Sequence, residues 1–384
     1  MAILFNLGCK LNQYEGFCLK KKYQDQDDVI IINTCCVTKE AEARSVRRFA
    51  QLLKRFPDKK IIATGCTCRL HPNKFAGAHL IIDNIARNQV IKDIQPLPDR
   101  SRFFLKIQDG CNGRCSFCVV SRIRDRIESK PLEQISAEIN WAKSNGYKEV
   151  VLVGANIGLY GLEHGSSLDQ LLNGLRQIRD LPRIRLSSTE PTFINRALIN
   201  ALKGLPFCRH FHIPIQSADE KVLKGMNRDY GPEQLTHAIG LISENFIDAG
   251  IGADIIVGFP AEGEAEFANT YRFVENNPFM HLHVFPYSPR PITEAYKLGD
   301  PVSTREKKNR LWRLRQLIRT KNYQFRKNLV NKILGVTIEK HNDQSFGLTD
   351  NYVRVRIDGQ CRERDLVDVR IDKVTDEGTY GTVV

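Results

Sequence analysis

Short apolar segments that alternate with helical stretches run through most of this chain and restrict it to an α/β fold. In the first part, helices are expected at 12–22 and 39–56, between strands at 2–7, 29–32, 60–63 and 79–82. This rhythm is typical of a parallel sheet whose crossover connections are helices. The run containing Pro96, Pro98, Asp99 and Arg100 indicates a linker, so we place a first domain at 1–95.

A second strand–helix series begins at Arg102. Its expected strands, separated mostly by helical stretches, are 103–107, 149–153, 183–187, 210–213, 252–257 and 282–285. Six such units predict a partial (β/α)6 barrel with reactive residues at the carboxyl ends of its strands. We expect this domain at 101–330, ending in a basic helix over 303–332 that has 11 Lys or Arg against one acid. The remainder, 333–384, contains short β-like runs such as 352–357 and 368–371, and it predicts a small β-barrel domain.

The composition predicts a globular cytoplasmic protein that is not associated with a membrane. Hydrophobic residues make up 42% of the chain, and no apolar run approaches the roughly 18 residues of a membrane span. The first residues lack the basic region and cleavage site of a signal peptide. Eleven cysteines, an odd number, argue against a disulfide framework and favour metal ligands, catalytic thiols or buried residues. The net charge of +13 favours a polyanionic partner, with nucleic acid the first candidate.

Cys111, Cys115 and Cys118 stand closely spaced after the first strand of the second series. Three thiolates at this spacing can hold three irons of a [4Fe-4S] cluster, because soft sulfur ligands suit such clusters. The loop offers no fourth cysteine, so one iron stays open to a small molecule. A zinc knuckle or a chance group of buried thiols is the alternative. Zinc requires a fourth Cys or His, and the next histidine, His164, is far along the chain.

Cys9, Cys35 and Cys66 form a second candidate set, because they follow the first three strands of the chain. The carboxyl ends of parallel strands meet at one edge of a sheet, so these thiols are expected to converge and to hold a second cluster. The alternative is that some are buried small residues. Cys36 and Cys68 stand beside two of them. We prefer Cys35 and Cys66, which come first after their strands, but an exchange stays open because neighbouring side chains point to opposite faces of a strand.

The cysteine motif at Cys111, with Phe117 before its last cysteine, resembles that of the radical S-adenosylmethionine (SAM) enzymes. Over nearly the whole length the chain resembles the methylthiotransferases of that group. The matching motifs are Leu7-Gly-Cys-Lys-Leu-Asn-Gln-Tyr-Glu15, Ile32-Asn-Thr-Cys-Cys-Val-Thr38, Thr64-Gly-Cys66, Arg185-Leu-Ser-Ser-Thr-Glu-Pro191, His212-Ile-Pro-Ile-Gln-Ser217, Asp254-Ile-Ile-Val-Gly-Phe-Pro260 and His283-Val-Phe-Pro-Tyr-Ser-Pro-Arg290. The resemblance implies a radical SAM barrel between a methylthiotransferase domain and a TRAM-like RNA-binding domain. It also implies two [4Fe-4S] clusters, SAM as cosubstrate, and both cysteine sets as catalytic metal ligands.

Residues at the ends of later barrel strands are candidates for contacts with SAM, as is Phe117. Gly154 and Asn156 follow one strand, where the backbone could meet the SAM amino group. The side chains of a second group could bind its ribose or amino acid portion: Ser187, Glu190, Gln216 and Asp254. The alternative for all of them is an ordinary cap or turn contact.

The motif Lys10-Leu-Asn-Gln-Tyr-Glu15, the pair Val37-Thr38, and the run from His283 to Pro291 resemble one subclass, which modifies N6-threonylcarbamoyladenosine in tRNA. The resemblance implies a methylthio group added at C2 of that base beside the anticodon. The implied partners are the anticodon stem-loop, an electron donor such as flavodoxin or ferredoxin, and a sulfur source. Alternative substrates are isopentenyladenosine in tRNA and an aspartate of ribosomal protein S12. The alternative outside enzymes is an iron–sulfur or zinc RNA-binding module.

The expected RNA-binding surface is uneven along the chain. Residues 333–384 have 7 Lys or Arg against 10 Asp or Glu, a net charge of −3. RNA binding requires cations near phosphates, so the basic helices at 39–55 and 303–332 are better candidates than the last domain as a whole. Alternatively, that domain presents a local basic face through Arg354, Arg356, Arg362 and Arg364.

Overall fold

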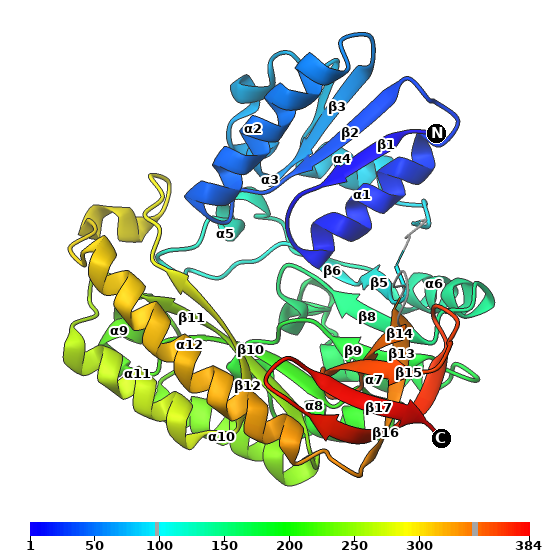
Figure 1. Ribbon diagram of the computed structural model, residues 1–384. Coiled ribbons are helices and arrows are strands. Elements are labelled where there is room, and N and C mark those ends of the chain that lie inside the picture. The colour runs from blue at the N-terminus through cyan, green and yellow to red at the C-terminus, as the bar shows by residue number, and fades with distance from the viewer. Residues whose placement is uncertain (97–99, 340–344) are drawn as a thin grey trace.

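The computed structural model describes residues 1–96, 100–339 and 345–384. Figure 1 shows three sheet assemblies along the chain: a first sheet with its helices in blue, a central barrel in green and yellow, and a small set of red strands at the C-terminus. The expected linker lies partly outside the described residues, because Pro98 and Asp99 belong to the gap. The domain boundaries at 1–95, 101–330 and 333–384 stay predictions.

The first sheet is parallel and four-stranded, in the order β1-β2-β3-β4. Its strands are β1 (Ile3–Asn6), β2 (Val29–Thr34), β3 (Lys60–Gly65) and β4 (Leu80–Ile82), and its helices are α1 (Lys10–Lys22), α2 (Lys39–Arg55), α3 (Cys66–Leu70), α4 (Asn84–Ile91) and the 3-10 turn η1 (Pro72–Phe75). Every residue of β2 is buried, because alternate side chains meet helices on opposite faces. Ile30 packs with Phe49 of α2, whereas Ile31 belongs with Leu19 of α1 to the large core of the molecule.

The central part has six parallel strands in two three-stranded sheets, ordered β5-β8-β9 and β10-β11-β12. Its strands are β5 (Phe103–Lys106), β8 (Glu149–Val153), β9 (Arg183–Leu186), β10 (His210–Gln216), β11 (Gly250–Val257) and β12 (Phe279–Pro286). Its helices are α6 (Leu132–Ser144), α7 (Leu168–Leu175), α8 (Arg196–Lys203), α9 (Glu220–Gly225), α10 (Pro232–Asn245) and α11 (Glu264–Asn276). A parallel bridge links Ile184 of β9 to Phe207, three residues before β10. The predicted partial barrel is confirmed.

Short strands, helical turns and one short helix lie in the connections between the barrel strands and helices. They are β6 (Gln108–Asp109), α5 (Val120–Ile123), β7 (Glu128–Ser129), η2 (Ile157–Leu159), η3 (Leu162–His164), η4 (Pro191–Phe193) and η5 (Glu294–Leu298).

Alternate residues of the barrel strands point toward the helices and toward an inner face. Phe103, Leu105, Ile213 and Ala253 belong to the core shared with the helices. On the inner face, Phe104, Val151 and Val153 pack against Leu11 at the start of α1. The first domain therefore covers part of the inner face of the barrel.

The basic helix α12 runs from Thr304 to Lys327, so the expected end at Lys332 is wrong. The chain turns after Lys327 because Leu329 is buried in the core of the small C-terminal domain. Asn331 then adopts a left-handed conformation with φ of 67°. Every helix of the described residues is too short or too polar to cross a membrane.

The C-terminal strands form a closed barrel in the order β13-β14-β15-β17-β16. They are β13 (Ile333–Glu339), β14 (Ser345–Thr349), β15 (Arg354–Asp358), β16 (Leu366–Val374) and β17 (Thr379–Val383). The predicted small β-barrel, TRAM-like in form, is confirmed. The strand expected at 352–357 begins only at Arg354, because Tyr352 has a φ of 72° and lies in a turn.

Candidate functional site

The loop with Cys111, Cys115 and Cys118 is a tight turn between β6 and α5. It starts at Gly110, which has a φ of 80° and whose place no larger residue can take, because a Cβ there would collide with the carbonyl of Arg126. Two backbone amides point at sulfur. The amide of Gly113 lies 3.3 Å from Cys111 Sγ, and the amide of Val120 lies 3.3 Å from Cys118 Sγ.

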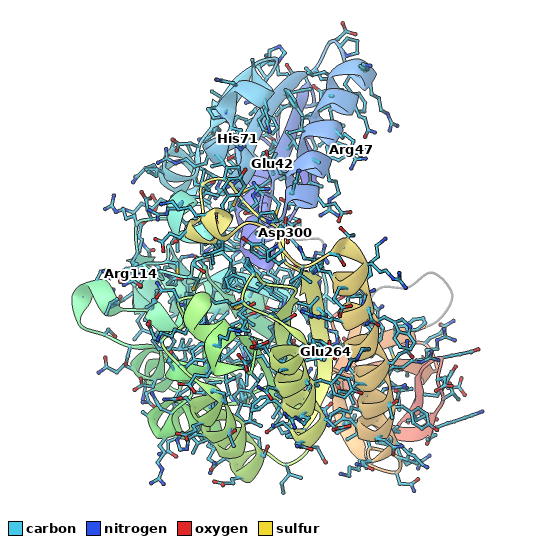
Figure 2. The ribbon with its side chains drawn as sticks, turned by 90° about the vertical axis from the view of Figure 1, so that its left-hand side faces the viewer. Glu42, Arg47, His71, Arg114, Glu264 and Asp300 are labelled. Carbon is cyan, nitrogen blue, oxygen red and sulfur yellow. The ribbon has the colours of Figure 1, made fainter. Side chains whose placement is uncertain are left out.

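The three thiols converge beside a cavity of about 300 Å³. Burial, together with the charges of Cys115 and Cys111, raises the pKa of Cys118 to about 11. The Arg228 guanidinium lies 2.8 Å from Cys115 Sγ and pairs with Glu190. Amide donors and a cation aimed at sulfur suit thiolates that carry the negative charge of an iron–sulfur cluster, so these residues fit one. Arg114, in the same loop, lies at the edge of the molecule in Figure 2.

Cys9, Cys35 and Cys66 lie together at the carboxyl edge of the first sheet. Cys35 directly follows β2, Cys66 directly follows β3, and Cys9 caps α1. Burial raises the pKa of Cys9 and the pKa of Cys35, and the nearby Cys66 raises both values further. The pKa of Cys35 reaches about 11. A Cβ added at Gly8 would lie 3.2 Å from Cys35 Sγ, which shows how closely the two segments approach. The donor set fits a second cluster, and the assignment of its ligands stays a prediction.

Cys36 and Cys68 differ in position. Cys66 packs against Cys36, and this contact lowers the pKa of the Cys66 thiol. β2 ends at Thr34, so the alternation of a strand does not separate Cys35 from Cys36, and Cys36 stays an alternative ligand. Cys68 is buried in the core of the first sheet and lies 3.5 Å from Thr34 Oγ1.

A buried ionic network connects the two cysteine sets. Glu15 of α1 is fully buried and contacts Arg87 at 2.6 Å, Arg124 at 2.8 Å and Lys106 at 3.1 Å. Asp109, just before the cysteine loop, contacts Arg124 and Lys106 at 2.6 Å each. Burial alone would raise the pKa of Glu15, but Arg124, Arg87 and Lys106 lower it to about 2. Arg124 also donates to Asn12 at 3.0 Å, and Asn12 Oδ1 lies 4.0 Å from Cys66 Sγ.

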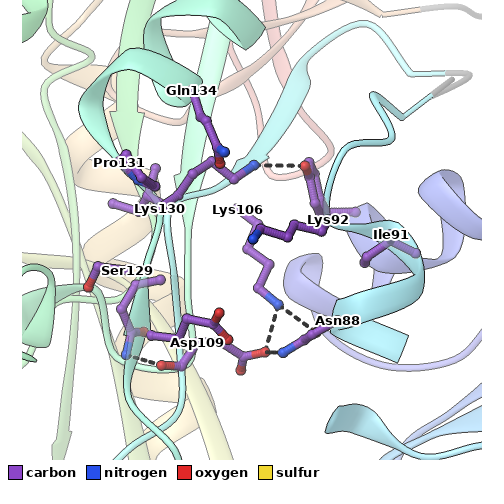
Figure 3. Close-up of a pocket in the computed structure, with 13 residues that line it drawn as sticks. Asn88, Ile91, Lys92, Lys106, Asp109, Ser129, Lys130, Pro131 and Gln134 are labelled. Atoms are coloured by element: carbon purple, nitrogen blue, oxygen red, sulfur yellow. Dashed lines mark hydrogen bonds and ion pairs between the residues drawn. The ribbon is translucent and has the colours of Figure 1, made fainter. Parts of the chain in front are cut away.

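Behind this network lies a second cavity, of about 290 Å³, between α4 and the β7 region. Figure 3 shows the Lys106 ammonium pointing toward Asn88 and Asp109, to which it donates hydrogen bonds. The lining of this cavity includes Lys92 and Lys130 but no cysteine. The cavity beside Cys111, by contrast, is lined by Cys111, Cys115 and Cys118.

The residues expected to contact SAM are placed in different surroundings. Asn156 caps η2, and its amide donates to Gln108 Oε1 at 3.0 Å, close to Gly154. Gln216 ends β10 in a left-handed conformation, with φ of 61°. Phe117 packs beside Phe259.

Of the three other residues expected to contact SAM, the two carboxylates are already paired with other side chains. Ser187 is partly exposed just after β9, and Glu190 is paired with Arg228. Asp254 lies within β11, so its expected place at a strand end is wrong. It accepts hydrogen bonds from His212 at 2.9 Å and His283 at 3.1 Å. Burial would raise the pKa of Asp254, but these two histidines hold it well below the usual range.

Sequence patterns did not single out Arg228, Gln108 or Arg124. Each acts through a contact with a residue far along the chain, and no local spacing signals such a contact. Lys10, which follows Cys9, begins the motif that indicated the subclass, but its sequence context gave it no individual role. Burial and the charges of Arg102 and Arg185 lower the pKa of Lys10 to about 8.

Comparison with known proteins agrees with this geometry. Residues 105–274 match the radical SAM superfamily, and residues 2–86 match the uncharacterized protein family UPF0004. The fold is similar to that of the radical SAM methyltransferase TsrM from Kitasatospora setae, with a TM-score of 0.57 and 12% identity over 77% of this chain and 76% of that one. At this identity the likeness concerns the fold alone.

Relatives in other organisms match nearly the full chain. The threonylcarbamoyladenosine tRNA methylthiotransferase MtaB of Aquifex aeolicus is 32% identical over 97% of this chain and 100% of its own length. The protein of the same name from Thermotoga maritima is 32% identical over 97% of this chain and 94% of its own. The tRNA-2-methylthio-N(6)-dimethylallyladenosine synthase of Thermodesulfovibrio yellowstonii is 30% identical over 98% and 97%. The chain therefore belongs to the radical SAM methylthiotransferase family.

Proposed function

We propose that this protein adds a methylthio group to C2 of N6-threonylcarbamoyladenosine beside the anticodon of tRNA, with SAM and two [4Fe-4S] clusters. The observation that carries the proposal is the pair of cysteine sets, one at the carboxyl edge of the first sheet and one in the loop after β6, joined by the network around Glu15. The names of two full-length relatives support the substrate.

Cys111, Cys115 and Cys118 would hold one cluster, and Cys9, Cys35 and Cys66 the other. When bound, the first supplies the reductive cleavage of SAM and hence the radical that takes hydrogen from C2, and the second supplies the site of sulfur transfer. The chain itself holds both sets in register. Arg228 balances negative charge at Cys115, and Arg124 bridges α1 to Asp109 beside the loop.

An adenine beside the anticodon is largely unpaired, which suits recognition of a splayed single-stranded base. We place the RNA along α12 and the adjoining C-terminal barrel. Between them lies a groove of about 430 Å³ lined by Arg326, Arg354, Arg356 and Phe346. Arg356 lies over the Phe346 ring at 5.4 Å, an arrangement of cation and aromatic ring that suits phosphates and bases.

The basic face expected on the last domain is only partly free for RNA. Arg364 lies over the ring of Tyr147 at 4.3 Å and donates to the carbonyl of Asn145, so it packs against the central barrel. Trp312 on α12 is 60% exposed and offers a stacking surface among basic residues. An electron donor such as flavodoxin or ferredoxin and a source of sulfur complete the proposed partners.

The test is mass spectrometry of tRNA nucleosides and of ribosomal protein S12 from a strain that lacks this protein, complemented with the wild type or with Ala at Cys9, Cys35, Cys66 or Cys111. We expect only the wild type to restore the 2-methylthio form of threonylcarbamoyladenosine. A gain of mass on isopentenyladenosine or on S12 instead would refute the proposed substrate. Product in the Cys35→Ala strain would assign the ligand to Cys36.

Failure of the reconstituted protein to cleave SAM with a competent reductant, despite loaded clusters, would favour an RNA-binding module. Stoichiometric zinc without iron would point to the same class of protein. Either result would refute the proposed reaction.

A further inference from the structure

Lys10 lies on the inner side of the barrel and has no ion-pair partner among the residues that the structure describes. It begins α1 directly after Cys9, and the neighbouring Leu11 packs against Phe104 and Val151 of the inner face. Among the described residues, the Lys10 ammonium contacts the ring of Tyr352, whose centre is 6.0 Å away. Within these residues no hydrogen bond or ion pair of Lys10 is recorded, so its charge is available to a ligand.

The surroundings of Lys10 add positive charge. Arg183 and Arg185 share one carboxylate, that of Glu149, at 2.8 and 2.6 Å. Arg102 pairs with Glu339 at 3.0 Å, and Glu339 is itself shared with Arg354. Burial disfavours the charge of Lys10, and Arg102 and Arg185 oppose it electrostatically, whereas Glu149 and Cys9 favour it. The group therefore has more cations than carboxylates.

Donor groups here also lack partners. Arg102 Nη1 is buried and forms no hydrogen bond within the described residues. His210 is 3% exposed, and neither ring nitrogen has a partner there, although the ring stacks on Tyr352 at 4.0 Å. Buried polar groups are normally satisfied, so unpaired donors that gather around a surplus of charge indicate a site for an oxyanion.

The inner face is open to a ligand. The side chain of His283, on the inner face of β12, is 52% exposed. Cys9 is exposed to solvent. Lys10 directly follows Cys9 at the start of α1.

We propose that Lys10, assisted by Arg102, binds the carboxylate on the N6 substituent of the substrate base. This inference rests on the proposed function and names the group by which the substrate is selected. A charge-assisted contact in a largely buried site favours a carboxylate strongly. A neutral substituent such as an isopentenyl group would leave the ammonium unpaired, so the same residue excludes it.

The experiment compares two anticodon stem-loops, one with N6-threonylcarbamoyladenosine and one with the carboxamide of its threonyl group. Binding and methylthiolation are measured with reconstituted wild type, Lys10→Gln, Lys10→Arg and the control Lys22→Gln, an exposed lysine of the same helix. We expect the wild type to prefer the stem-loop with the free threonyl carboxylate by about 10- to 100-fold, chiefly in Kd and KM. Lys10→Gln should lose this preference, Lys10→Arg should keep most of it, and Lys22→Gln should match the wild type.

An equal loss of affinity for both RNAs in Lys10→Gln would overturn the inference, because Lys10 would then serve the cluster or an RNA phosphate. A weakened Kd for SAM with an intact preference between the RNAs would also overturn it, by assigning the carboxylate to SAM. The binding preference needs no turnover. A wild type that prefers the acid but transfers no methylthio group would therefore refute the proposed reaction and support the role of Lys10.

Discussion

Replacing Glu15 by Gln tests whether the buried network holds the first domain against the barrel. Glu15 is fully buried and faces three cations, Arg87, Arg124 and Lys106. Arg124 and Lys106 also contact Asp109, whereas the ion pair of Arg87 in this network is with Glu15. The substitution keeps the shape of the side chain and removes one of these two negative charges. The three cations then stay buried with one carboxylate nearby instead of two, which lowers the stability of the folded protein.

The magnitude follows from the pKa of Glu15, which the network lowers from 4.5 to about 2. At about 1.36 kcal/mol per pKa unit, the ionised form stabilises the fold by on the order of 3 kcal/mol. Breaking a buried ion pair costs about 3–5 kcal/mol, which agrees. Because the folded pKa is lowered, this stability is present above pH 4.5 and is lost as the pH falls through about 2.

The assay is urea denaturation of the full chain from pH 7 to pH 2.5, with hydrogen exchange of the α1 amides. We expect Glu15→Gln to be less stable at pH 7 and to approach the wild type as the pH falls. The control Asp28→Asn removes a surface pair with Lys60 and should leave the midpoint unchanged. A loss below about 1 kcal/mol at pH 7, or one that does not shrink in acid, would refute the reasoning.

Three further predictions concern the cysteine loop and the RNA groove. Arg228→Gln removes the cation beside Cys115 Sγ, so the reduction potential of the bound cluster should fall by about 60 mV. A redox titration followed by EPR measures this potential, and an unchanged value would contradict the role of Arg228. Gly110→Ala should distort the loop and remove about half of the bound iron in a quantitative iron assay, whereas full iron would show that the turn tolerates a Cβ. The double variant Arg354→Ser with Arg356→Ser should reduce the slope of log Kd for tRNA against log salt by about 1–2, and an unchanged slope would place the phosphates elsewhere.

Much of the architecture was predictable because its signals are local. The fully buried run of β2 and the helical periodicity of α2 each depend on residues within a few positions of one another. The ends of elements were less predictable. Helix α12 ends at Lys327 because Leu329 enters another core, and β15 starts late because Tyr352 turns toward His210. Both endings are set by partners distant in the sequence.

The candidate site divides in the same way. The sequence by itself determined the spacing of Cys111, Cys115 and Cys118 and the place of Cys9, Cys35 and Cys66 after parallel strands, since covalent spacing and strand order are properties of the chain. Only the tertiary structure decided that Arg228 meets Cys115, that Cys36 reaches Cys66, and that Asp254 is held by two histidines. It also decided the surplus of positive charge at Lys10, because Arg102, Arg185 and Tyr352 come from segments that only folding brings together. Charges act through space, and their balance exists only once the chain has folded.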